Sequence, residues 1–166
     1  MKKYLKILAL VVLSVLCLAA VCACTDKPED KVITVESVSK LDVATDEVAL
    51  VLKESDTEYT IKVVKLSELG ENANGETLVQ YLANGKEITV DWQDSEYGKY
   101  ITSYSGKTLA DNEFVSVYTS VESDKGADAY AKTITLGKYA VTSSAVGITS
   151  AKVEGGAVLY LQIESY

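Results

Sequence analysis

Apolar and polar residues alternate through most of the chain after residue 32, and this period of two predicts β-strands. Polar residues 54–58 separate the first pair of alternating segments, and Gly137 with Lys138 separates a later pair, so each pair is expected to form a hairpin. The predicted strands span residues 48–52, 59–66, 99–105, 114–121, 133–136, 139–141 and 157–163.

One segment departs from this pattern and predicts a helix. Leu78, Val79 and Leu82 form an apolar stripe with helical spacing. Asn74 or Thr77 is expected to cap its start, with Thr77 and Gln80 forming a capping box. Asn84-Gly85 is expected to end it with a left-handed residue.

The order of these elements predicts the fold class. A hairpin, one short helix and several further strands favour an α+β fold, a β-grasp-like mixed sheet packed on the helix. An all-β sandwich is the alternative. Within the last strand, Leu159, Leu161 and Ile163 are expected to face the core together.

The first 24 residues carry a different signal. Three lysines precede an apolar run, 7–21, which is shorter than the roughly 20 residues that a membrane-spanning helix needs. Small residues then lead to Cys24, as in a lipoprotein signal peptide. We therefore expect cleavage before Cys24, lipidation of Cys24, and localisation at the extracytoplasmic face of the cell membrane. The expected division is a signal peptide at 1–23, a lipidated tether and lead-in at 24–44, and a domain at 45–166.

Composition narrows the function further. The chain has no histidine and no arginine. Its cysteines are Cys17, Cys22 and Cys24, and only Cys24, the expected lipidation site, is expected to remain after cleavage. The Ser-His-Asp and Cys-His catalytic systems and the usual zinc sites therefore cannot be built. Three of the 16 lysines lie in the leader and all 24 acids follow it, which leaves the rest of the chain with a formal charge of −11. Nucleic acid is therefore not an expected partner. No cofactor and no metal are expected.

Two groups of residues are candidates for a site. Trp92, Tyr97, Tyr100 and Tyr104 lie within thirteen positions, and such aromatic rings bind flat ligands, sugars or proteins. Because Tyr100 and Tyr104 are an even number of residues apart in a strand, they are expected to point the same way. The alternative is that the aromatic residues pack in the core.

The second group is acidic. Asp91, Asp94 and Glu96 supply oxygen ligands of the kind that bind Ca²⁺. Their spacing differs from the alternating acids of a calcium loop, so a solvated turn is the favoured interpretation.

Gly98, Tyr100, Ile101 and Ser103 form a Gly-x-Tyr-Ile-x-Ser motif, and Phe114 begins the strand predicted after it. Together with several other segments, this motif resembles the bacterial domain family related to the C-terminal domain of transcobalamin, in which tryptophan is usual at the position of Phe114. The resemblance spans about residues 47–165 and is carried by segments 75–82, 95–106, 114–120, 144–148 and 153–160. It implies a β-grasp-like fold and a bacterial surface setting. We expect no counterpart in this chain of the α-barrel domain that completes the cobalamin site of transcobalamin.

The sequence therefore predicts a membrane-anchored binding module without catalytic activity. Its expected partners are the membrane, through the N-terminal lipid, and a small molecule, a glycan or an envelope protein. Two alternatives remain open, a carboxylate-dependent hydrolase of an extracellular polymer and a corrinoid-binding protein by analogy with transcobalamin.

Overall fold

The computed structural model describes residues 33–34, 38–96 and 98–166, and this part of the chain is mostly β-sheet. The strands are β1 (Ile33–Thr34), β2 (Glu47–Lys53), β3 (Glu58–Lys65), β4 (Val90–Ser95), β5 (Gly98–Tyr104), β6 (Lys107–Thr108), β7 (Glu113–Thr119), β8 (Thr133–Leu136), β9 (Tyr139–Ser143) and β10 (Ala157–Ser165). The helices are α3 (Leu66–Leu69), α4 (Gly75–Asn84) and the 3₁₀ turn η1 (Glu122–Asp124). Cys24 and the leader lie outside the described residues.

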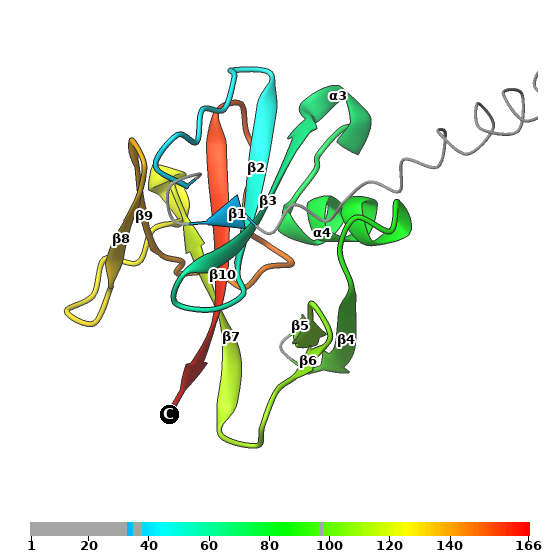
Figure 1. Ribbon diagram of the computed structural model, residues 1–166, viewed down its shortest axis with the longest axis vertical. Helices are drawn as coiled ribbons and strands as arrows, with labels where there is room; N and C mark the ends of the chain where they lie inside the picture. Colours follow the sequence, from blue (N-terminus) through cyan, green and yellow to red (C-terminus); the bar gives the residue numbers. More distant parts are fainter. Residues whose placement is uncertain (1–32, 35–37, 97) are drawn as a thin grey trace, which may run out of the picture. The chain divides into compact units, whose positions relative to one another are not determined.

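Seven strands form a curled mixed sheet in the order β1-β3-β2-β10-β7-β9-β8 (Figure 1). The last strand, β10, lies between β2 and β7, parallel to β2 and antiparallel to β7. The other three strands, β4, β5 and β6, form a separate small sheet. The predicted sheet-rich fold is confirmed, as are both hairpins, β2 with β3 and β8 with β9.

The first face of the large sheet packs on α4. Leu78, Val79 and Leu82 are fully buried and belong to one apolar cluster with residues of β2 and β10, including Leu50 and Leu161. The predicted helical stripe therefore lies in the core. Burial of each such side chain stabilises the fold by about 1.5–3 kcal/mol.

The N-cap of α4 is one of the two predicted residues, but the capping box and the C-terminal stop differ from those predicted. Asn74 is the N-cap, and its Oδ1 accepts the Thr77 backbone N–H at 2.9 Å, so the capping box joins Asn74 to Thr77 rather than Thr77 to Gln80. Gln80 instead donates to Glu76. Gly85 is right-handed with φ −72°, and the left-handed residue is Lys86 at φ 59°. The predicted left-handed stop at Asn84-Gly85 is therefore displaced by one residue, because the chain continues its helical turn through Gly85 before it reverses.

The second face of the large sheet has its own apolar cluster. Val38, Leu41 and Val43, which fall in the predicted lead-in, are buried there against side chains of β2, β7, β8, β9 and β10. Both faces of the central strands are thus covered, which explains why all five residues from Val48 to Leu52 are buried.

A tyrosine network lies on this second face. The rings of Tyr118 and Tyr160 meet edge to face at 5.5 Å between centroids. Tyr118 donates to Glu164 Oε1 at 2.6 Å, and Gln162 Nε2 donates to the Tyr118 hydroxyl. Burial raises the pKa of Tyr118 to about 12, and the adjacent Glu164 carboxylate adds to the effect. Desolvation opposes ionisation of Glu164, but hydrogen bonds from Tyr118, Gln162 and Lys132 outweigh it and lower the pKa of that carboxyl.

We expect Tyr118 to make the protein sensitive to alkali. Its pKa is higher in the folded than in the unfolded chain, so its stabilisation is complete below about pH 10 and is lost as the pH rises toward about 12. Between about pH 10 and 12, the unfolding free energy of Tyr118→Phe should decrease less than that of the wild type, by up to about 2 kcal/mol. Chemical denaturation at each pH measures this decrease. Tyr130→Phe, at an 89% exposed tyrosine, is the control. An identical alkaline fall in wild type and Tyr118→Phe would contradict the assignment.

No helix among the described residues has both the length and the apolar character needed to span a membrane.

Candidate functional site

The small sheet carries most of the predicted site residues. In it β4 pairs with β5 and β5 with β6, all antiparallel. The register shifts within the β4–β5 pair, because Asp91 lies opposite Ser103 while Trp92 lies opposite Ile101. Thr102 is therefore an extra residue in β5, a β-bulge that reverses the alternation of faces along the strand.

The bulge separates the two tyrosines that were expected to share a face. Tyr100 is 44% exposed, whereas Tyr104 is fully buried, so the prediction that they point the same way is wrong. Tyr104 lies in the apolar cluster beneath α4, and its hydroxyl donates to the Lys53 carbonyl at 2.7 Å. Burial raises the pKa of Tyr104, and its ring is part of the core rather than of a surface.

The other predicted site residues also separate. Trp92 is half-buried and packs against the same cluster as Tyr104. Tyr97 lies outside the described residues. Of the acidic group, Asp91 accepts a hydrogen bond from the Ser103 hydroxyl at 2.5 Å. Within residues 33–34, 38–96 and 98–166, no three His, Cys, Asp or Glu side chains are grouped to hold a metal ion.

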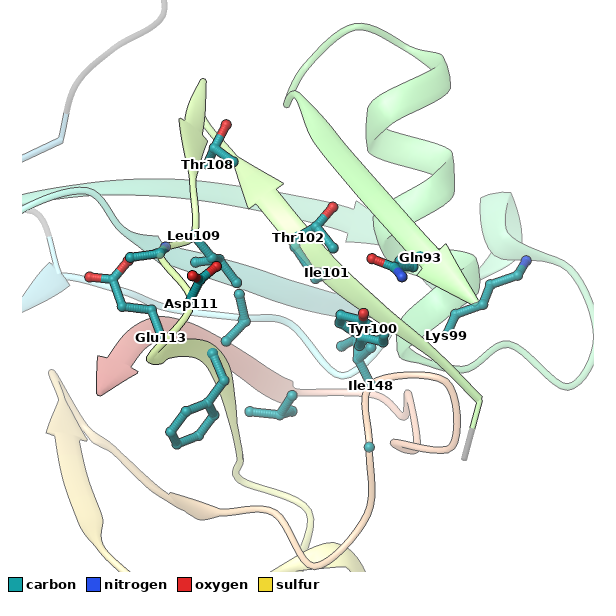
Figure 2. Close-up of a pocket in the computed structure, with 15 residues that line it drawn as sticks. Gln93, Lys99, Tyr100, Ile101, Thr102, Thr108, Leu109, Asp111, Glu113 and Ile148 are labelled. Carbon is teal, nitrogen blue, oxygen red and sulfur yellow. The ribbon is translucent and has the colours of Figure 1, made fainter. Parts of the chain in front are cut away.

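A groove of about 570 Å³ lies between β5 of the small sheet and β7 of the large one (Figure 2). We call it the β5–β7 groove. The residues that line it are Gln93, Lys99, Tyr100, Ile101, Thr102, Thr108, Leu109, Ala110, Asp111, Glu113, Phe114, Val115, Val117, Gly147 and Ile148. Its volume falls in the usual range for small-molecule sites, about 300–1,000 Å³.

The apolar lining of the groove is continuous with the core. Ile101 and Ile148 are buried in the apolar cluster beneath α4, and Val115 and Val117 pack against it. Side chains fixed in this way form a largely preformed surface.

The start of α4 fixes the wall that carries Ile148. Gly75 donates its N–H to the Ala151 carbonyl at 2.8 Å, and an added Cβ at Gly75 would lie 2.5 Å from the Ile148 carbonyl oxygen. Only glycine permits so close an approach. The first residue of α4 therefore also positions one side of the groove.

The charged residues of the groove lie at opposite ends (Figure 2). Asp111 and Glu113 are together at one end and Lys99 is at the other. Lys99 pairs with Glu76 at 2.8 Å, and this hydrogen bond and charge raise the pKa of Lys99. No described lysine forms an ion pair with Asp111 or Glu113.

Tyr166 holds the acidic end of the groove in place through hydrogen bonds and a ring contact. The hydroxyl of Tyr166 donates to the Asp111 carbonyl at 2.6 Å, and its backbone N–H donates to the Asn112 carbonyl. The Tyr166 ring lies 6.4 Å from that of Phe114, between centroids. In addition, Glu113 Oε2 accepts the Ala110 N–H at 2.8 Å. Residues 110–114 are thus held by contacts with Tyr166, which does not line the groove, and by a hydrogen bond within the segment.

Sequence reasoning identified only Tyr100 among the residues that line the groove. The segment 108–113 has no periodic pattern, and its side chains meet Tyr100 only because the small sheet folds beside β7. The one sequence feature that pointed to this wall of the groove was Phe114, a large apolar residue directly after the polar residues 111–113. Its side chain is 40% exposed.

The groove combines an apolar floor, two exposed aromatic rings, those of Tyr100 and Phe114, and an acidic end. This arrangement suits binding of an elongated ligand with apolar parts and a positive charge. No protein-family model matches the chain, and no curated protein matches it significantly.

Proposed function

We propose that this protein is a lipid-anchored extracytoplasmic module that binds its ligand in the β5–β7 groove without covalent chemistry. The observation that carries the proposal is the groove itself, a concave surface with an apolar floor and a few polar groups at its ends. Sites of this kind are the usual location of ligands in proteins. Cys24 and the preceding apolar segment support the anchor.

The form of the groove favours a binder over a hydrolase. A carboxylate-dependent hydrolase needs two acids set around the scissile bond, one of them with a raised pKa. The acids of this groove are Asp111, which is exposed, and Glu113, whose carboxylate accepts a hydrogen bond from the backbone N–H of Ala110. Both stand at one end rather than on the floor.

The strand order supports a β-grasp-like assignment for the large sheet. A hairpin, β2 and β3, is followed by α4, and β10 returns in the centre parallel to β2, with β7 and then β9 beyond it. This order agrees with the proposed relationship to the transcobalamin C-terminal domain family. The residues that resemble that family's signature, 98–103, lie on β5 beside the groove.

A blocking variant tests the proposed function. Gly147 lines the groove, and an added Cβ there meets no atom within 4 Å, so Gly147→Phe should fold while its ring occupies the groove. We expect this variant of the full chain to lose most of the fluorescence increase of the apolar dye N-phenyl-1-naphthylamine. The matched control, Ala145→Phe, places the same ring on an exposed position outside the groove lining.

Partition of the dye into lipid or detergent is common to both variants and cancels in the comparison. Equal fluorescence from Gly147→Phe and Ala145→Phe would contradict the proposal. Cyanocobalamin titrated in the same two variants tests the corrinoid alternative.

A further inference from the structure

One edge of β7 is open along the groove. On its other side, β7 pairs with β10 over its whole length, from Glu113 to Thr119. Its pairing with β9 covers only Tyr118 and Thr119. The first half of β7 is therefore an edge strand, and it lies among the residues that line the groove.

The hydrogen bonds show which backbone groups point away from β10. Ser144 N–H donates to the Val117 carbonyl from the β9 side, and Glu113 N–H donates to the Ala110 carbonyl. Because backbone groups alternate along a strand, the N–H and C=O of the odd-numbered residues face outward.

Four of these outward groups have no hydrogen-bond partner among the described residues. They are the Glu113 carbonyl, the N–H and the carbonyl of Val115, and the Val117 N–H. They form a ladder spaced for one more strand, and an unpaired edge of this kind is a template for strand addition.

The side chains around this edge suit an extended peptide. An added strand would present alternate side chains to the apolar lining and to the exposed ring of Tyr100. The acidic residues Asp111 and Glu113 lie at the end where β7 begins, and no described lysine forms an ion pair with either. A basic residue at that end of the peptide would complement them.

We propose that the ligand of the β5–β7 groove is an extended peptide segment that adds a strand to β7 at Val115 and places a lysine or arginine beside Asp111 and Glu113. This inference rests on the proposed function, since it names the class of ligand that the groove takes. Main-chain hydrogen bonds supply affinity in such strand addition, and the side-chain contacts supply selectivity.

The test uses capped hexapeptides of alternating valine and threonine, with one lysine at either the first or the last position. Six extended residues reach about 20 Å, enough to pass the four open groups. We expect one of the two lysine peptides to bind the full chain in fluorescence anisotropy. The same peptide with glutamate in place of lysine should bind a few-fold more weakly. In Asp111→Asn, the difference in affinity between the lysine and glutamate peptides should be smaller.

Val115→Pro removes the outward N–H without touching the hydrogen bonds to β10, because the Val115 N–H faces away from that strand. The matched control is Val115→Ala, which shortens the side chain and keeps the N–H. The peptide should bind Val115→Pro at least about tenfold more weakly than Val115→Ala. The proline removes the hydrogen bond from the residue 115 N–H to the peptide, and the peptide carbonyl opposite it is then buried without a donor. Equal binding by the two variants would overturn the inference.

N-methylation of the peptide gives a second readout that requires no change to the protein. Each peptide carries one methyl group on one backbone nitrogen. If the peptide adds a strand to β7, methylation should weaken binding only at every second peptide residue, because only alternate N–H groups face β7. Equal effects at all positions would overturn the inference.

The two proposals fail differently. If Gly147→Phe excludes the dye but neither lysine peptide binds the wild type, the peptide inference is wrong and the groove remains a binding site for another ligand. If Gly147→Phe changes neither dye nor peptide binding, both proposals are wrong.

Discussion

Tyr104→Ala is expected to lower the free energy of unfolding by about 3–5 kcal/mol, the usual cost of truncating a large buried aromatic side chain. The Tyr104 ring is fully buried between β5 and the cluster beneath α4, and its hydroxyl is bonded to the Lys53 carbonyl. Truncation removes the apolar contacts, opens a cavity and leaves that carbonyl without its side-chain donor. Urea denaturation of the variant and the wild type measures the loss.

Tyr100→Ala is the matched control, because it removes the same side chain four residues earlier in the same strand. Tyr100 is 44% exposed and lies at the groove, so its truncation should cost no more than about 1 kcal/mol. Similar losses in the two variants would mean that the bulge at Thr102 does not separate their faces.

Leu82→Ala is expected to cost about 2–5 kcal/mol. Leu82 is fully buried in the cluster that joins α4 to β2 and β10. Lys86→Ala, at an exposed position just after the helix, should change stability by less than about 0.5 kcal/mol. If Leu82→Ala were as mild as Lys86→Ala, α4 would not be part of the core.

The strands of the large sheet could be predicted because their burial depends on local alternation. Within β10, Leu159 and Leu161 face the first cluster while Val158 and Tyr160 face the second, and a period of two in the sequence encodes this directly. The two hairpins could be predicted because a polar turn, 54–58, or a glycine-containing turn, Gly137-Lys138, separates the alternating segments.

The small sheet was only partly predictable. β5 was predicted from the sequence, but β4 was not. Residues 88–93 alternate between apolar and polar, but the alternation stops at Gln93, Asp94 and Ser95, which are all exposed. The bulge at Thr102 depends on how β4 and β5 pair across the turn, and no residue type in β5 marks it. A one-residue shift of this kind moves every side chain beyond it to the other face, which is why Tyr104 was placed wrongly.

The groove lay beyond sequence reasoning for a related reason. Its walls come from segments far apart in the chain, such as Tyr100 on β5, Val115 on β7 and Ile148 in the loop before β10. The open edge of β7 depends on where pairing with β9 stops, and that point is set by backbone geometry rather than by side-chain character.

Amide hydrogen exchange along β7 tests the central claim most directly. In the free protein the Val115 amide should exchange quickly, whereas the amides of Phe114 and Ser116, which face β10, should be protected. Saturation with the lysine hexapeptide should slow exchange at Val115 and Val117 and leave Phe114 and Ser116 as they were. Unchanged exchange at Val115 and Val117 in the presence of bound peptide would contradict the account, because the peptide would then be held somewhere other than the open edge of β7.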